Sequence, residues 1–263
     1  MNILFIADII GGPGRKLVKE VLPQVIEGRQ VDFCIANGEN AAGGYGLTED
    51  IADELFAMGI DVLTSGNHIW DRRELLPILD TRSDILRPAN YPPENPGAGS
   101  GVFPSRNGLQ VGVVNLQGRV FMKEIDCPFR TAGPVIQKIK EQTSLVVVDF
   151  HAEATAEKVA MGLFLDGQVS AVIGTHTHIQ TADERILPGG TGYITDAGMS
   201  GGTEGVIGVK KEAAIKRFLT QTPSRFQPAD TSLVMMGVIL KVDPETCRTE
   251  SIERLQIPKS NAQ

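Results

Sequence analysis

Residues 170–178 read "SAVIGTHTH". The first five letters form a largely apolar run, which is typical of a strand buried on both faces. Two histidines, His176 and His178, follow the end of this run one residue apart. The whole chain contains only 4 histidines. A buried strand that ends in imidazole side chains is the pattern from which both the fold and the site are predicted.

Buried strands of this kind recur along the chain, with amphipathic helices between them. The strand-like runs are "NILFIA" (2–7), "VDFCIA" (31–36), "DVLTS" (61–65), "SLVVVDF" (144–150) and "TGYITDAG" (191–198). Helical periodicity is found at 17–26, 48–58, 135–141, 155–165 and 209–219. Because strands that alternate with helices form layered folds, the sequence predicts an α/β protein with a partly parallel, mixed sheet.

Antiparallel hairpins add to this alternation. Asn107-Gly108 is a strong turn signal between two strand-like runs. Residues 231–243 and 246–257 predict a closing antiparallel pair. The proline-rich stretch 80–107 has the composition of a surface excursion and not that of a linker between two foldable halves. We therefore expect a single domain over residues 1–263.

Local signals predict where several helices begin and end. Pro23 interrupts the first helical pattern, so we expect a kink or an early end there. Thr48 can cap the next helix, and Gly59 lies just past its end. Asp71 with Glu74 resembles a capping box for the helix after that.

Composition excludes several classes of protein. The 25 Lys and Arg residues against 32 Asp and Glu residues give a net charge of -7, which disfavours a surface that wraps duplex nucleic acid. The 3 cysteines are widely spaced and indicate neither a disulfide framework nor a thiolate zinc site. The apolar N-terminus is interrupted by Asp8, and no apolar run approaches the ~20 residues of a membrane span. We expect a cytoplasmic protein with no membrane partner.

A polar cluster follows each of five predicted strands. Together these clusters include every histidine of the chain: Asp8, Glu39 with Asn40, Asn67 with His68, His151, and His176 with His178. Each residue alone has an ordinary explanation, because histidine and asparagine often serve as hydrogen-bonded turn residues. In an open α/β sheet, however, the carboxyl ends of parallel strands lie at one edge, where ligands bind. We therefore expect the five clusters to meet.

Carboxylate, amide and imidazole groups in one place suit a site for two metal ions. They are ligands for iron, manganese or zinc, and the absence of thiolates disfavours a structural zinc. Two cations about 3.5 to 4 Å apart need a bridging carboxylate, and Glu39 is central among the clusters. An extended backbone at Thr177 would point His176 and His178 in different directions, so that each serves a different metal.

The blocks "ADII", "GEN", "GNHIW", "FHAE" and "GTHTH" resemble, in this order and over most of the chain, the motifs of the calcineurin-like metallophosphoesterases. Three positions depart from the family pattern. Ile10 stands where a metal-binding histidine is usual, Glu39 replaces an aspartate, and Thr175 replaces a histidine. Asn40 can supply an amide oxygen in place of the missing imidazole. The stretches "NGENAAGGYGLT", "TSGNHIWD", "NLQGRVFM", "DCPF" and "DAGMSG" resemble the branch of YmdB-type bacterial phosphodiesterases.

This resemblance implies a four-layer α-β-β-α sandwich with mixed sheets and a binuclear metal centre. The implied ligands are Asp8, Glu39, Asn40 and His178 for one metal, and Glu39, Asn67, His151 and His176 for the other. His68 would stay unligated as the catalytic proton donor. The implied reaction is hydrolysis of a small cyclic-nucleotide phosphodiester, 2',3'-cyclic AMP in particular, by a hydroxide that bridges the metals. Iron is expected ahead of manganese or zinc.

Several alternatives stay open. A phosphomonoesterase would share the metal centre, and a regulatory module would sense nucleotides with weak turnover. A purely structural metal protein is disfavoured, because these ligand types leave room for solvent on the metals.

The roles of several residues also have alternatives. His68 can fix Asn67 in place and not act as the proton donor. Trp70 can stack a base or pack in the core, and residues 119–121 can line a cleft or form a surface loop. The glycines of "GGPGR" lack the spacing of a phosphate-binding loop. A homo-oligomer is also left open.

Overall fold

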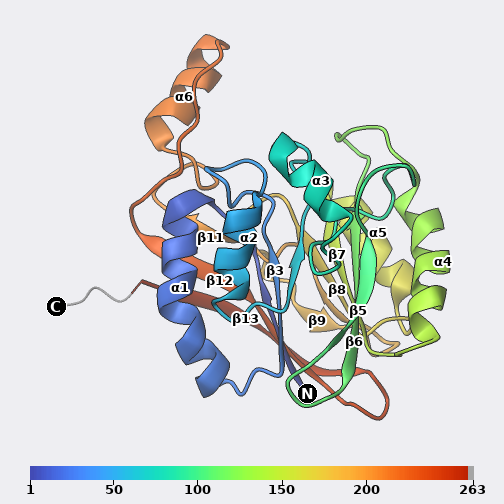
Figure 1. Ribbon diagram of the computed structural model, residues 1–263. Coiled ribbons are helices and arrows are strands. Elements are labelled where there is room, and N and C mark those ends of the chain that lie inside the picture. Colours follow the sequence, from blue (N-terminus) through green and yellow to red (C-terminus); the bar gives the residue numbers. More distant parts are fainter. Residues whose placement is uncertain (260–263) are drawn as a thin grey trace.

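The computed structural model describes residues 1–259 and is built around two mixed β-sheets (Figure 1). In the first sheet the strand order is β2-β11-β12-β1-β3-β4, with β13 paired to β12. Its strands are β1 (Asn2–Ile6), β2 (Asp8–Ile9), β3 (Phe33–Asn37), β4 (Val62–Thr64), β11 (Met199–Gly202), β12 (Leu233–Val242) and β13 (Thr249–Pro258). In the second sheet the order is β5-β6-β7-β8-β10-β9. Its strands are β5 (Ser100–Pro104), β6 (Gln110–Gln117), β7 (Val146–His151), β8 (Ala171–Thr175), β9 (Arg185–Ile186) and β10 (Gly192–Ile194).

Helices cover the outer face of each sheet. The helices of residues 1–259 are α1 (Gly11–Gly28), α2 (Glu49–Phe56), the 3-10 helix η1 (Arg73–Leu75), α3 (Leu76–Leu79), α4 (Pro128–Lys140), α5 (Thr155–Leu165) and α6 (Lys211–Thr220). In Figure 1, α1 and α2 lie on the first sheet, α4 and α5 lie on the second, and α6 extends away from the body. The expected four-layer α-β-β-α arrangement is confirmed. Among the helices of residues 1–259, none combines the length and the apolar character that crossing a bilayer requires.

Strand β1 shows why the two sheets pack as a sandwich. Successive side chains of a strand point to opposite faces of its sheet. Leu4 and Ile6 belong to the apolar cluster shared with α1, whereas Ile3 and Phe5 belong to the cluster between the two sheets. Both faces of β1 are therefore buried, which explains why its sequence is a continuous apolar run and not an alternating one.

Strand β7 repeats this alternation in the second sheet. Val147 packs between the sheets, while Val146 and Val148 pack against the outer helices.

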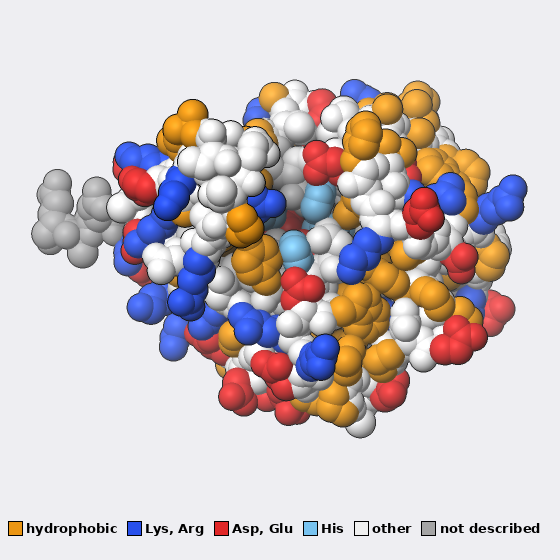
Figure 2. All heavy atoms as spheres, turned by 90° about the horizontal axis from the view of Figure 1, so that it is seen from above, with side chains coloured by type: hydrophobic (Ala, Val, Ile, Leu, Met, Phe, Trp, Pro, Cys, Tyr) orange, Lys and Arg blue, Asp and Glu red, His pale blue; other side chains and the backbone are white. Residues whose placement is uncertain are grey.

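Strands β1, β3 and β4 run parallel to one another in the first sheet, as do β6, β7 and β8 in the second. The carboxyl ends of both sets lie on the side that Figure 2 views from above. The polar clusters therefore come from both sheets of the expected sandwich, and not from one open sheet.

Most predicted helices are present, with differences at their ends. The hydroxyl of Thr48 accepts a hydrogen bond from the backbone N–H of Ile51 at 3.4 Å, which confirms the cap of α2. Helix α1 does not end at Pro23 but continues beyond it. Pro23 is exposed, so water can bond the carbonyl that loses its partner. Helix α4 begins at Pro128, well before the expected start near Val135.

The capping box expected at Asp71 and Glu74 was wrong. Arg72 precedes η1 and forms no side-chain cap. The carboxylate of Asp71 is instead 2.8 Å from Nδ1 of His68. An aspartate at this position can cap a helix or bind a nearby side chain, and the sequence looks the same in both cases. Only the contact with His68 shows which role Asp71 has.

Candidate metal centre

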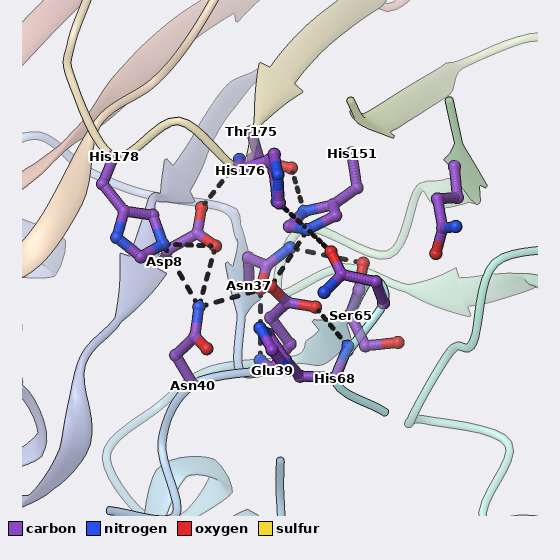
Figure 3. A network of polar contacts seen from close by, with 12 residues as sticks. Asp8, Asn37, Glu39, Asn40, Ser65, His68, His151, Thr175, His176 and His178 are labelled. Carbon is purple, nitrogen blue, oxygen red and sulfur yellow. Dashed lines mark hydrogen bonds and ion pairs between the residues drawn. The ribbon is translucent and has the colours of Figure 1, made fainter. Parts of the chain in front are cut away.

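The seven predicted ligands and His68 lie together at the carboxyl ends of strands from both sheets (Figure 3). Asp8 is the first residue of β2, Glu39 and Asn40 follow β3, Asn67 and His68 follow β4, His151 is the last residue of β7, and His176 and His178 follow β8. Strands β7 and β8 belong to the second sheet. The cluster therefore joins the two halves of the sandwich, while the ligand role of each residue stays a prediction.

Glu39 lies at the centre of this cluster and is fully buried. Its Oε1 is 3.0 Å from Nε2 of His151 and 3.3 Å from Nδ2 of Asn40. Its Oε2 accepts a hydrogen bond from the backbone N–H of His68 at 3.1 Å. One carboxylate thus contacts both groups of predicted ligands, as a bridging ligand must.

One group of ligand atoms surrounds Nε2 of His151. This nitrogen is 3.2 Å from Oδ1 of Asn67 and 3.0 Å from Nδ1 of His176. One candidate ligand atom from each of Glu39, His151 and His176 lies within 4.8 Å of the other two. These residues are the predicted ligands of the second metal.

The other group surrounds Asp8, which is also fully buried. Oδ1 of Asp8 is 3.6 Å from Nε2 of His178 and 3.4 Å from Nδ2 of Asn40. Nδ2 of Asn40 is also 3.2 Å from Nε2 of His178. A half-turn of the terminal amide exchanges Nδ2 for Oδ1. That rotation brings an oxygen ligand of Asn40 to the same place.

Hydrogen bonds on the outer nitrogen of two histidines direct the inner nitrogen toward the cluster. Nδ1 of His151 is 2.9 Å from Oγ1 of Thr175, whose hydroxyl donates to Asp149 at 2.7 Å. Nδ1 of His178 is 2.9 Å from the carbonyl oxygen of Ile207. Since both partners accept the Nδ1 proton, each ring in its neutral form would present the lone pair of Nε2 inward. Metal-ligating histidines are held in this way.

Charges within the cluster reinforce one another. Burial opposes ionisation of Asp8, but the hydrogen bond and charge of His178 outweigh it and lower the pKa of Asp8 to about 2. Burial likewise opposes protonation of His178, yet Asp8 raises the pKa of that ring to about 9. Against the same effect of burial, Glu39 and His151 shift each other's pKa, lowering that of Glu39 and raising that of His151. Burial and repulsion from His151 lower the pKa of His176 to about 3.

The donor set fits metal ions on chemical grounds. Two buried carboxylates, Asp8 and Glu39, converge here with several imidazoles, and carboxylates repel each other unless positive charge, from protonated imidazoles or from metal ions, lies among them. Oxygen and imidazole nitrogen are ligands that iron, manganese and zinc accept. Gly66 permits the close packing, because a Cβ at that position would overlap both His151 and Glu39.

The turn between the paired histidines is not extended, contrary to expectation. His176 and His178 have φ angles of 99° and 63°, in a region that residues other than glycine rarely adopt. The backbone N–H and the hydroxyl of Thr177 donate to Oδ2 of Asp196 at 3.0 and 2.7 Å. Nζ of Lys158 donates to the same oxygen at 2.6 Å. This turn still gives each imidazole to a different group of ligands.

Sequence analysis missed the residues that support the cluster from behind. Lys158 is 1% exposed and lies on the buried face of α5 with Met161 and Leu165. A lysine in an apolar helical series was the available signal, because a buried charge needs a partner. Thr175 and Asp149 gave no such signal, since a threonine and an aspartate are common at strand ends.

His68 lies beside the cluster and borders the cavity in front of it. Its Nδ1 bonds to Asp71, and its ring packs edge to face against Tyr45 with centroids 5.0 Å apart. Within residues 1–259 no hydrogen bond occupies its Nε2. An imidazole that is bonded to a carboxylate on one nitrogen and open on the other is suited to transfer a proton.

A cavity of about 400 Å³ opens onto the cluster. Figure 2 shows histidine side chains within this hollow. A second hollow is lined by Asn67, Phe121, Met122, Lys123 and His176. Phe121 is 90% exposed, so residues 119–121 form a surface loop that also reaches this hollow. Trp70 packs against Tyr91 and the first apolar cluster and does not line either hollow.

Known proteins resemble this chain over nearly its whole length. The model of a family described as YmdB-like protein matches residues 4–255. The 2',3'-cyclic-nucleotide 2'-phosphodiesterase of Bacillus subtilis is 47% identical over 257 residues, which cover 98% of this chain and 97% of that protein. A hypothetical protein from Thermus thermophilus has a TM-score of 0.92 at 38% identity, covering 99% of this chain and 100% of that one. A novel phosphatase from Mycoplasma pneumoniae has a TM-score of 0.92 at 33% identity, covering 100% and 95%.

Proposed function

The chain belongs to the YmdB-like family and is a phosphoesterase, and from this premise we propose that it hydrolyses cyclic-nucleotide phosphodiesters of the 2',3' class with two bound metal ions. The name of the Bacillus subtilis relative, 2',3'-cyclic-nucleotide 2'-phosphodiesterase, supports the substrate class. The observation that carries the proposal is the convergence of both groups of predicted ligands on one buried carboxylate, Glu39.

The assignment of ligands is part of this proposal. Asp8, Glu39, Asn40 and His178 would hold one ion, and Glu39, Asn67, His151 and His176 the other. We propose iron ahead of manganese or zinc. When bound, ions of this kind polarise phosphoryl oxygens and lower the pKa of water.

Residues of the chain supply the proton transfer. Hydrolysis adds water across one P–O ester bond, and the alcohol oxygen that leaves must receive a proton. His68 borders the cavity and is oriented by Asp71 through Nδ1, so its Nε2 can donate that proton. In a 2',3'-cyclic substrate the leaving oxygen stays on the same ribose, and the product is a nucleoside monophosphate.

Metal content and substrate preference test the proposal together. Protein purified without added metal should contain about two equivalents of transition metal per chain. It should hydrolyse 2',3'-cyclic AMP and bis-p-nitrophenyl phosphate faster than p-nitrophenyl phosphate. Protein without bound transition metal that is still fully active would contradict the metal centre.

A phosphomonoesterase is the second candidate. The similar Mycoplasma pneumoniae protein of known structure is described as a phosphatase, and the same metal centre serves both reactions. Faster turnover of the monoester p-nitrophenyl phosphate than of the diester would favour this candidate over the diesterase.

A further inference from the structure

The cavity in front of the metal centre has an apolar wall beside the predicted ligands. Its apolar side chains are Ile10, Tyr45, Ile207, Val209, Phe226 and Pro228. They come from the segment after β2, the loop between β3 and α2, and the segments on either side of α6. A phosphate group needs cations and hydrogen-bond donors and gains nothing from such a wall. The wall must therefore contact another part of the ligand.

Tyr45 is held firmly in this wall. Its carbonyl oxygen accepts a hydrogen bond from Nε of Arg72 at 3.1 Å, and Arg72 also donates to the carbonyl of Ala42 at 2.6 Å. Its ring packs against that of His68. An aromatic ring is thus fixed directly beside the proposed proton donor.

Phe226 places a second aromatic ring in the wall. The guanidinium of Arg217, on α6, lies 5.0 Å from the centroid of this ring, a distance typical of a cation–π contact. Burial raises the pKa of Tyr45, and the charge of Arg217 opposes that shift. Arg217 of α6 therefore supports the ring of Phe226 in the wall.

The position of His68 indicates which part of the substrate meets this wall. A proton donor must contact the leaving oxygen, and in a nucleoside cyclic phosphate that oxygen belongs to the nucleoside. Because His68 lines this cavity, the nucleoside must enter it. Cavities of this size hold small ligands, and flat aromatic side chains bind nucleobases by stacking.

We propose that this cavity is the nucleobase site of the enzyme, with Phe226 and Tyr45 as the residues against which the base stacks. This inference rests on the proposed function, since it places the substrate by its leaving oxygen. Stacking is tolerant of base identity, so the site selects nucleoside cyclic phosphates over phosphodiesters that lack a base.

A pair of substrates that differ only in the base tests this site. One is 2',3'-cyclic AMP, and the other is methyl ribofuranoside 2',3'-cyclic phosphate, in which a methoxy group replaces adenine. The wild-type KM should be at least about fivefold lower for the nucleotide. Phe226→Leu should raise the nucleotide KM toward that of the baseless substrate, so that the ratio of the two KM values falls toward one. Phe226→Trp, which keeps a flat ring, should retain the preference.

Two further aromatic residues provide matched controls. Phe218 is 73% exposed on α6 and Phe121 is 90% exposed at the second hollow. Phe218→Ala and Phe121→Ala should leave the preference for the nucleotide unchanged. A loss of the preference in Phe121→Ala together with its retention in Phe226→Leu would move the base to the second hollow and overturn the proposal.

Binding of substrate fragments that carry no phosphate separates this inference from the proposed function. Calorimetry with adenosine and with methyl ribofuranoside measures binding at the base site without turnover, because neither compound contains a phosphoester bond. Tighter binding of the adenosine compound that is lost in Phe226→Leu supports the base site, even if no diester is hydrolysed and the proposed function fails. Equal binding of the two compounds by the wild type overturns the base site, whether or not diesters are hydrolysed.

Discussion

Within residues 1–259, the hydrogen bond that joins His68 to the predicted ligands is donated by its backbone N–H to Glu39. Replacing its side chain therefore removes the proposed proton donor without removing a predicted ligand. We expect His68→Ala to lower kcat by about 10²- to 10⁴-fold with unchanged metal content. Steady-state kinetics and elemental analysis of one preparation check both values. Undiminished function of this variant in cells would favour a nucleotide-sensing module over an enzyme.

Thr175 orients His151 by accepting its Nδ1 proton while donating to Asp149. Thr175→Val keeps the shape of the side chain but removes the hydroxyl, so His151 loses the contact that fixes its ring. We expect metal affinity to fall by about 10- to 100-fold, as measured by titrating metal-depleted protein with manganese. Thr175→Ser keeps the hydroxyl and should bind like the wild type. Equal affinity of the valine variant would show that His151 is oriented by other contacts.

At the scale of elements, a buried ion pair supports the turn after β8. Lys158 and Asp196 are both fully enclosed, and Asp196 also binds Thr177 between the paired histidines. Lys158→Met would leave the Asp196 carboxylate buried without a cation. We expect a loss of about 3 to 5 kcal/mol in the free energy of unfolding, measured by urea denaturation.

A surface pair provides the control for that prediction. Lys241 pairs with Glu250 on the outside of β12 and β13, where both side chains are largely exposed. Exposed pairs contribute little to stability, so Lys241→Met should unfold at nearly the wild-type urea concentration. If Lys158→Met were as stable as Lys241→Met, the turn would not depend on the buried pair.

The elements also show where local sequence is sufficient. Helix α5 has the same ends, Thr155 and Leu165, as its apolar periodicity predicts. Helix α1 does not follow the local rule, because its buried face continues past Pro23. Packing of that face against the sheet outweighs the single hydrogen bond that proline removes, and such packing cannot be read from the proline itself.

At the scale of the whole molecule, the cluster joins the two sheets. Glu39 follows β3 of the first sheet, and His151 ends β7 of the second. A metal held between them would bind the folded chain and not the unfolded one. Adding manganese at about 100 times its Kd should therefore stabilise the metal-depleted protein by about 2.7 kcal/mol. Differential scanning calorimetry would detect this as a rise in Tm.

Two variants make that measurement specific. Glu39→Gln removes the charge of the central carboxylate and should abolish most of the rise in Tm. Glu253, which pairs with Arg29 on the surface, lies outside the cluster, so Glu253→Gln should keep the full rise. An equal rise in all three proteins would place the stabilising metal elsewhere.

The sequence by itself determined the alternation of strands and helices and the polar residues at the strand ends, because burial on two faces and chain reversal leave local patterns. It also carried the family resemblance. Only the tertiary structure decided that two facing sheets form the site and that Asp196 holds the turn around Thr177. It also decided that Tyr45 and Phe226 share one wall. These contacts join residues far apart in the chain, and their geometry depends on how whole layers pack, which no local pattern records.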